Sequence, residues 1–166
     1  MTPLKTGDIL LFRPTSIMGY LASLITWSRY SHAAMIEVID GVPYCLEVRE
    51  FFGGRKIELE KYVGKYEVWR LKDMPYSRFG EHAVFEMSKF VGMEYGWCHI
   101  VSAVLLRFVR AYECRECKKH PPFCSEAVSR AYRNAGIDPR PDLADRFTLP
   151  GDLADSPYLE KIFEVF

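Results

Sequence analysis

Cys124 is the strongest candidate nucleophile because a helix is expected to begin at it. It lies in the segment HPPFCSEAVSRAYRNAG, where two prolines end a loop and place the cysteine in the first turn of a helix predicted over Phe123 to Ala135. The unpaired N–H groups and the positive dipole end of a helix start favour thiolate, the form that attacks a carbonyl carbon. A cysteine on the apolar side of a helix is often an inert core residue, so catalysis requires a base nearby.

His32 is the candidate base, and Glu47 is the candidate group that orients it. The dipeptide Asp40-Gly41 predicts a tight turn between two strand-like runs, Ser31 to Ile39 and Val42 to Arg49. A two-residue turn makes His32 and Glu47 diagonal neighbours on one face, about 7 to 8 Å apart at the backbone. A carboxylate at that separation reaches the imidazole and fixes its tautomer.

Two alternatives stay open for this pair. A lone histidine in an apolar strand is often a structural residue, and the same register places Arg49 beside His32, where Glu47 would form an ordinary ion pair. A turn one residue longer would move Glu47 to the other face of the sheet. Glu47 is therefore a hypothesis that depends on the register of the hairpin.

A second cluster of reactive residues has the spacing of a metal site. Cys114, Cys117 and His120 form C-x-x-C-x-x-H in a basic loop that ends in prolines, and this spacing supplies three ligands to a tetrahedral zinc. A fourth ligand is not evident, although Cys98 and His99 precede the loop. The alternatives are a solvated loop with free thiols and a disulfide between Cys114 and Cys117.

Composition and charge narrow the class of protein. The chain has 166 residues, 49% of them hydrophobic, which predicts one domain over residues 1–166 with a substantial core. Its 22 Lys and Arg balance 22 Asp and Glu, and this neutrality argues against a nucleic-acid partner. The five cysteines, an odd number, favour free thiols over a disulfide framework.

The N-terminal sequence and the apolar runs predict where in the cell the protein resides. The start, MTPLKTGDILLF, lacks the features of a signal peptide, which predicts a cytoplasmic protein. The apolar run from Trp97 to Val109 is shorter than the roughly 20 residues that cross a bilayer, so stable membrane insertion is not expected. A buried helix is the favoured interpretation of this run, and a surface that grips lipid or an apolar partner is the alternative.

The elements that must position these residues predict an α+β protein. An antiparallel sheet of about five strands is expected to pack against helices, with the nucleophile at the N-terminus of a late helix. Strands are predicted over Asp8 to Arg13, Ser31 to Ile39, Val42 to Arg49, Arg55 to Glu60 and Glu67 to Leu71. Helices are predicted over Thr15 to Trp27, Arg78 to Val91, Trp97 to Arg110 and Phe123 to Ala135.

Four short segments of the chain form a recognisable set: Gly7-Asp8-Ile9-Leu10, Tyr30-Ser31-His32-Ala33, Gly92-Met93-Glu94-Tyr95 and Phe123-Cys124-Ser125-Glu126. Together they resemble the circularly permuted NlpC/P60 proteins, a papain-like family, and the ending Leu149-Pro150-Gly151-Asp152-Leu153 is also similar. The resemblance is to the branch that includes the YiiX and YebB-like hydrolases, which is distantly similar to the lecithin:retinol acyltransferases. In ordinary NlpC/P60 enzymes a Cys-Ser helix comes before the Gly-Asp and His strands, whereas here the Cys-Ser helix comes last.

The resemblance implies a cysteine peptidase or amidase with a catalytic Cys124, a base His32 and a polar third residue at Glu47. It further implies that Tyr30 and Tyr95 are candidates to contact the oxyanion or the substrate, although Tyr30 is equally suited to be a strand aromatic. No cofactor is expected. The insertion from Tyr112 to Pro122 is not typical of the family.

The implied substrate is a peptide-like amide, such as a cell-wall stem peptide, which a cytoplasmic protein would reach through lysis, injection or another delivery route. A lipid acyltransferase or esterase of the retinol-acyltransferase type is an alternative. Those enzymes carry Asn-Cys-Glu-His around the nucleophile, whereas this chain has Phe-Cys-Ser-Glu. A non-catalytic binding module is the third hypothesis.

Overall fold

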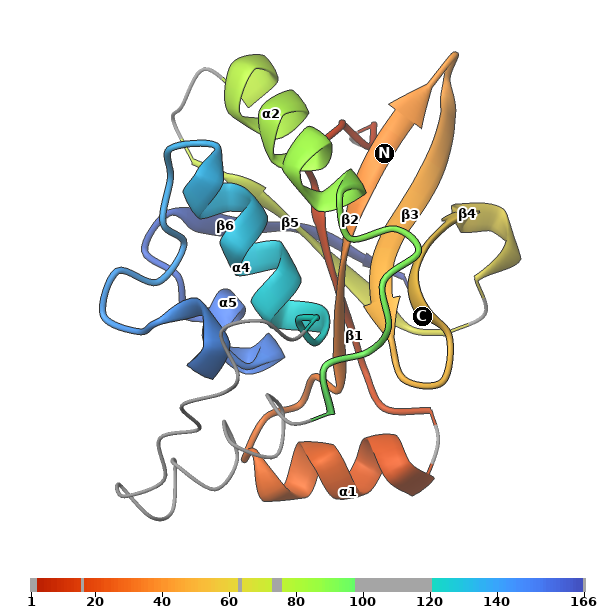
Figure 1. Cartoon of the computed structure of the whole chain (residues 1–166), viewed down its shortest axis with the longest axis vertical. Coiled ribbons are helices and arrows are strands. Elements are labelled where there is room, and N and C mark those ends of the chain that lie inside the picture. The colour runs from red at the N-terminus through yellow and green to blue at the C-terminus, as the bar shows by residue number, and fades with distance from the viewer. Residues whose placement is uncertain (1–2, 16, 63, 73–75, 98–120, 166) are drawn as a thin grey trace.

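A six-stranded antiparallel sheet forms the centre of the molecule (Figure 1). The computed structural model describes residues 3–15, 17–62, 64–72, 76–97 and 121–165. The strand order is β4-β3-β2-β1-β5-β6, so the central strands β2 and β1 come from the first quarter of the chain. The strands are β1 (Ile9–Phe12), β2 (His32–Ile39), β3 (Val42–Arg49), β4 (Gly53–Glu58), β5 (Tyr66–Leu71) and β6 (Leu159–Val165).

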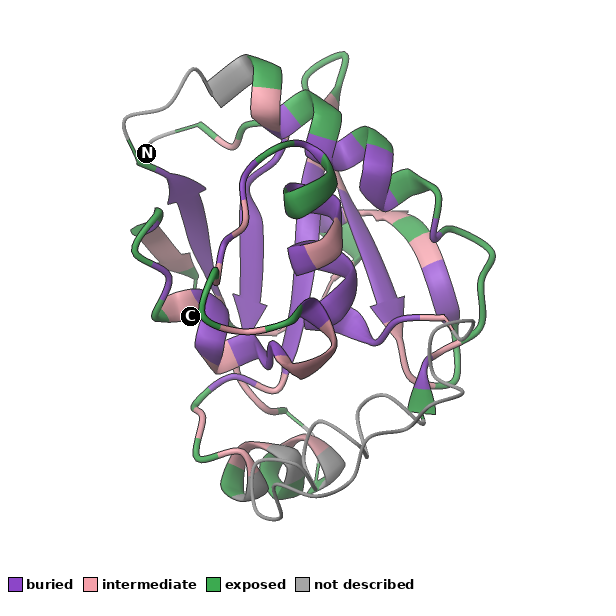
Figure 2. Cartoon of the chain, turned by 60° about the vertical axis from the view of Figure 1, so that its left-hand side comes forward, coloured by how far each residue is buried: buried purple, intermediate pink, exposed green. Residues whose placement is uncertain are grey.

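Helices α2 and α4 lie side by side on one face of this sheet (Figure 1). Helix α1 lies beyond one end of the sheet instead, and much of its surface faces solvent (Figure 2). None of the helices in the described part of the chain combines the length and the apolar character needed to cross a bilayer. The helical elements are α1 (Ile17–Ile25), α2 (Tyr76–Ser88), α4 (Cys124–Asn134), α5 (Pro150–Ala154) and the 3₁₀ turns η1 (Leu59–Lys61) and η3 (Asp145–Phe147).

The α+β class and the antiparallel sheet are as the sequence predicts, and so is the hairpin at Asp40-Gly41. Both turn residues have positive φ, 50° at Asp40 and 81° at Gly41, and Ile39 pairs with Val42 across the turn. These dihedrals suit the two-residue turn whose twist matches that of the flanking strands.

The prediction of about five strands is wrong by one, because β6 adds an edge strand that pairs with β5. Its sequence, LEKIFEV, is mostly half-buried or exposed, so its apolar residues give no clean alternation. The predicted helix from Trp97 to Arg110 lies outside the described residues, apart from Trp97 itself.

Alternation along the strands separates two apolar clusters, one on each face of the sheet. Residues such as Leu11, Met35 and Leu46 face the side that α2 and α4 cover and pack with residues of those helices, including Met87 and Tyr132. The other face carries a second cluster, whose buried members are Leu10, Phe12, Ala34, Ile36, Cys45, Leu59 and Val68.

The Gly7-Asp8 pair ties the helices to the sheet. Gly7 has a φ of 94°, and a Cβ there would lie 2.4 Å from the Cα of Gly80 in α2, so a side chain would block the approach of that helix. Tyr132 of α4 donates a hydrogen bond to the Gly7 carbonyl. Asp8 accepts two hydrogen bonds from Arg70 of β5, at 2.7 and 2.8 Å. This part of the family-like motif is therefore structural.

Candidate active site

Cys124 is the first residue of α4, and its neighbours in the Cys-Ser-Glu sequence fix the start of that helix. The Ser125 hydroxyl donates to the carbonyl of Thr148 at 2.8 Å, and the Glu126 carboxylate accepts from the backbone N–H of Phe123 at 3.4 Å. Glu126 also pairs with Arg130 one turn later. These contacts hold the first turn in place and leave Cys124 as the side chain of this segment that is available for chemistry.

His32 and Glu47 meet as the hairpin register predicts. His32 is the first residue of β2, at the end of the sheet where α4 begins (Figure 1). Its Nε2 lies 2.6 Å from Oε2 of Glu47, and both side chains are buried. The ring packs against Phe12, with the ring centroids 5.5 Å apart. The carboxylate therefore fixes one ring nitrogen, and packing limits the ring's rotation.

Glu47 also binds two residues that the sequence did not single out. Arg55 of β4 reaches Oε1 with Nε at 2.7 Å and Nη2 at 2.6 Å, and the Tyr62 hydroxyl donates to Oε2 at 2.8 Å. Arg49 lies farther away, at 4.0 Å. Glu47 is thus both the partner of His32 and half of an ion pair, but its close arginine is Arg55 and not the Arg49 that the sequence suggested. The longer turn that would have moved Glu47 to the other face is not formed. Register could have pointed to Arg55, which pairs directly with Glu47 across β3 and β4.

The Cys124 thiol lies close to His32 without an aligned hydrogen bond. With Nε2 bound to Glu47, the other ring nitrogen, Nδ1, is buried and has no hydrogen-bond partner of normal geometry among the described residues. Cys124 is nevertheless close enough to raise the pKa of His32 through hydrogen bonding and charge. Adjacency without good alignment is common for catalytic pairs before substrate binds.

The electrostatics of this cluster favour an ionised pair. Burial lowers the pKa of His32, but the interactions with Cys124 and Glu47 outweigh it and raise the pKa to about 10. Burial raises the pKa of Glu47, but His32, Tyr62 and Arg55 hold it at about 2. Near neutral pH His32 is therefore an imidazolium that pairs with the Glu47 carboxylate and lies close to the sulfur of Cys124.

These shifts predict how stability depends on pH. The pKa of His32 is above its ordinary 6.5, so its contribution is complete below pH 6.5 and is lost as the pH rises through about 10. The pKa of Glu47 is below its ordinary 4.5, so its contribution is complete above pH 4.5 and is lost as the pH falls toward 2. Urea unfolding of His32→Gln should show a shallower alkaline decline than the parent protein, and identical declines would contradict the assigned ion pair.

Tyr95 lies beside the candidate nucleophile, as its place in the family-like segment implies. It packs against the small cluster formed by Phe123, Cys124 and Leu149. Burial raises its pKa above the ordinary range, and the charges of Cys124 and Glu50 add to this. Tyr95 therefore lies beside Cys124, and its contact with a substrate stays a prediction.

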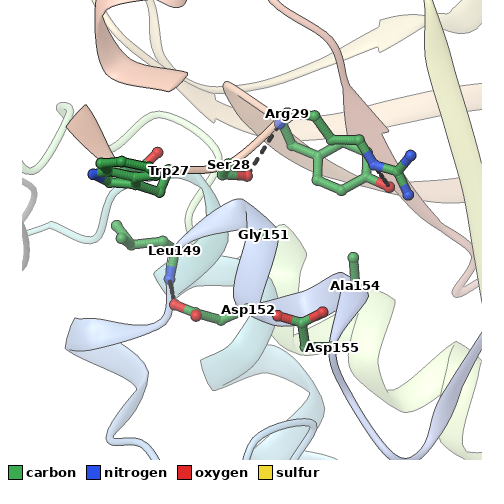
Figure 3. A pocket seen from close by; sticks show the side chains of 10 residues that line it. Trp27, Ser28, Arg29, Leu149, Gly151, Asp152, Ala154 and Asp155 are labelled. Carbon is green, nitrogen blue, oxygen red and sulfur yellow. Dashed lines mark hydrogen bonds between the residues drawn. The ribbon is translucent and has the colours of Figure 1, made fainter. Parts of the chain in front are cut away.

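Tyr30 has a different setting. Its hydroxyl donates to Glu67 of β5 at 2.7 Å and accepts a hydrogen bond from Arg29 at 3.1 Å. These two contacts engage the hydroxyl, and a role of Tyr30 at the oxyanion stays a prediction. Tyr30 does line a pocket between the segment before β2 and the start of α5, shown in Figure 3. Leu149, which packs in the Cys124 cluster, lines the same pocket, so the pocket adjoins the candidate site.

The residues predicted as a metal loop, Cys114, Cys117 and His120, lie outside the described residues, as do Cys98 and His99. Within the described ranges no group of three or more His, Cys, Asp and Glu side chains is arranged to hold a metal ion. The zinc loop stays a prediction, which metal analysis of the purified protein would test.

Comparison with known proteins identifies a similar fold. No protein-family model and no curated protein sequence matches the chain. A solved structure described as the metalloprotein yiiX from Escherichia coli O157:H7, DUF1105, is similar over 100% of this chain and 99% of that one, with a TM-score of 0.72 and 20% sequence identity. At this identity the similarity establishes a YiiX-like fold, and the term metalloprotein applies to that protein.

Proposed function

We propose that this protein is a cysteine hydrolase of the permuted papain-like type, with Cys124 as nucleophile, His32 as base and Glu47 as the residue that orients His32. One observation carries the proposal. A cysteine at the first position of a helix lies close to a buried histidine, and a carboxylate holds Nε2 of that histidine at 2.6 Å. This is the order of nucleophile, base and orienting group used in acyl transfer, on segments far apart in sequence.

The proposed reaction has two steps. The Cys124 thiolate attacks the carbonyl carbon of an amide, ester or thioester, and a carbon–sulfur bond forms as the negative charge moves to the carbonyl oxygen. The N–H groups at the start of α4 face that oxygen, and His32 gives its proton to the leaving nitrogen, oxygen or sulfur as the scissile bond breaks. His32 then takes a proton from water as the water oxygen attacks the thioester carbon. The carbon–sulfur bond breaks, the carboxylic acid is released, and Cys124 leaves as the thiolate beside the protonated His32.

The favoured substrate is a peptide-like amide. The Phe-Cys-Ser-Glu sequence supports the amidase side of the resemblance, since Ser125 and Glu126 serve the helix start and are not catalytic partners. A cell-wall peptide fits this class, and cleavage of the wall by a cytoplasmic protein would require lysis, injection or another route of delivery.

Lipid acyl transfer or ester hydrolysis is the second candidate, and α1 favours it. Ile17, Tyr20, Leu21 and Leu24 are exposed and recur at helical spacing, and Trp27 beyond the helix is 91% exposed. An uncharged apolar helix face flanked by an exposed aromatic side chain is typical of segments that lie in a lipid interface.

A substrate panel tests the proposal and separates the two classes. Purified protein and Cys124→Ala would be assayed on peptide amides, simple esters and phospholipid vesicles, with release of amine, alcohol or fatty acid as the readout. We expect hydrolysis of peptide amides that Cys124→Ala lacks. Activity on phospholipid alone would overturn the amidase assignment, and equal activity of both proteins would overturn the thiol mechanism.

A further inference from the structure

A second pocket adjoins the candidate site at Tyr95, and half of the residues that line it are aromatic. Two loops form it, one between β3 and β4 and the other after α2. Its residues are Phe51, Phe52, Gly53, Gly92, Met93, Glu94, Tyr95 and Trp97. Nothing in the proposed acyl transfer accounts for most of these rings.

The backbone holds the two loops together tightly. The N–H of Gly54 donates to the carbonyl of Met93 at 2.7 Å, and the N–H of Gly92 donates to the carbonyl of Gly54 at 2.8 Å. A Cβ at Gly54 would lie 1.8 Å from the carbonyl oxygen of Phe90, and one at Gly53 would lie 2.2 Å from that of Met93. A side chain is therefore excluded at Gly53 and Gly54, and the backbone contacts hold the two loops, with their aromatic residues, in a fixed arrangement.

Phe51, in the loop between β3 and β4, departs from ordinary backbone geometry. Its φ is 67°, a left-handed conformation that costs free energy for a bulky residue, and 86% of its surface is exposed. Strain of this kind, retained at an exposed aromatic residue, points to a functional constraint on the ring's position.

The rings of Phe51, Tyr95 and Trp97 contact one another edge to face. The ring centroids of Phe51 and Trp97 are 5.5 Å apart with planes at 61°, and those of Tyr95 and Trp97 are 5.0 Å apart with planes at 68°. Trp97 is 46% exposed, so part of its surface is open to a ligand. The face of an aromatic ring carries negative charge and attracts a cation, so these rings give the pocket a lining that suits a cation.

The charged residues near these rings are acidic. Glu94 lines the pocket, and Glu50 is close enough to raise the pKa of Tyr95. Among the described residues no Lys or Arg lines the pocket. Arg55 stacks on the Phe52 ring at 4.3 Å, but its charge is already paired with Glu47.

We propose that this pocket binds an organic ammonium group. Aromatic faces with an adjacent carboxylate attract a weakly hydrated cation, whereas an acyl chain would gain nothing from Glu94 and Glu50. Tyr95 belongs both to this pocket and to the surroundings of Cys124, so the ammonium group belongs to the substrate. That last step rests on the proposed function, whereas binding of the cation does not.

Choline and its neutral isostere 3,3-dimethyl-1-butanol are the matched probes, because they share shape and differ in charge. Titration of the full-length Cys124→Ala protein by calorimetry should show saturable binding of choline, weaker by roughly tenfold or more for the neutral alcohol. Trp97→Leu and Glu94→Gln should each weaken choline binding several-fold. Trp27→Leu, which changes an exposed tryptophan in the other pocket, should leave it unchanged.

Two results would overturn the cation site. Equal affinity for the alcohol would show a purely apolar pocket, and absence of saturable choline binding would remove the site altogether. Because binding is measured without turnover, its outcome is independent of the enzyme hypothesis. Choline binding in a protein inactive on every amide and ester would sustain the pocket and overturn the proposed function, whereas turnover without choline binding would do the reverse.

Discussion

Replacing Cys124 with alanine is expected to lower kcat/KM on any amide or ester substrate by roughly three orders of magnitude or more, because the covalent route is lost. Cys45→Ala is the matched control. Cys45 is also buried, but burial and the charge of Glu47 hold its pKa well above the ordinary value, so it stays a thiol. Its replacement should leave turnover within a few-fold of the parent protein.

Alkylation locates the reactive thiol without a known substrate. Iodoacetamide is small, which suits a side chain that is 2% exposed, and peptide mapping by mass spectrometry assigns each modified cysteine. We expect faster modification at Cys124 than at Cys45, and His32→Gln should slow it. Fast modification of Cys45 with an inert Cys124 would contradict the assignment of the nucleophile.

Removing the carboxylate of Glu47 is expected to have the largest effect on stability. Glu47→Ala leaves buried His32 and its ion-pair partner Arg55 without their counter-charge, which typically costs about 3–5 kcal/mol in the free energy of unfolding. Glu37→Ala on the same hairpin is the matched control, because its ion pair with Lys56 is partly exposed and such pairs contribute at most about 1 kcal/mol. Urea unfolding of the three proteins measures the difference.

The conservative variant Glu47→Gln tests whether Glu47 orients His32 or only fills space beside it. An amide of the same shape keeps the volume, but it can donate to Nε2 and so favour the wrong tautomer of His32. We expect kcat to fall by roughly two orders of magnitude or more while KM changes little. Unchanged kcat in a folded Glu47→Gln protein would reduce Glu47 to a structural ion-pair partner.

Neighbouring residues of the Cys-Ser-Glu segment have different roles in the structure. Ser125 and Glu126 contribute hydrogen bonds that fix the helix start, and Asp8 of the Gly-Asp segment binds Arg70 in the same structural sense. Cys124 and His32, by contrast, come from two of these short motifs and interact with one another. The family-like pattern therefore mixes residues that build the site with residues that would act in it.

The sequence by itself determined the features that depend on local geometry. Asp40-Gly41 specified a two-residue turn, and the turn set the register that brings His32 and Glu47 together. The two prolines before Phe123 specified where α4 begins and hence the position of Cys124 at its first turn. Each of these follows from backbone preferences over a few residues, which a sequence displays directly.

Only the tertiary structure decided which distant side chains complete the cluster. Arg55 and Tyr62 reach Glu47 from other segments, Tyr30 is bound by Glu67, and β6 adds an edge strand from the end of the chain. The aromatic pocket likewise exists because two loops approach closely at Gly53 and Gly54. Such pairings are selected by packing and by the need to compensate buried charge, and neither leaves a periodic signal along the chain.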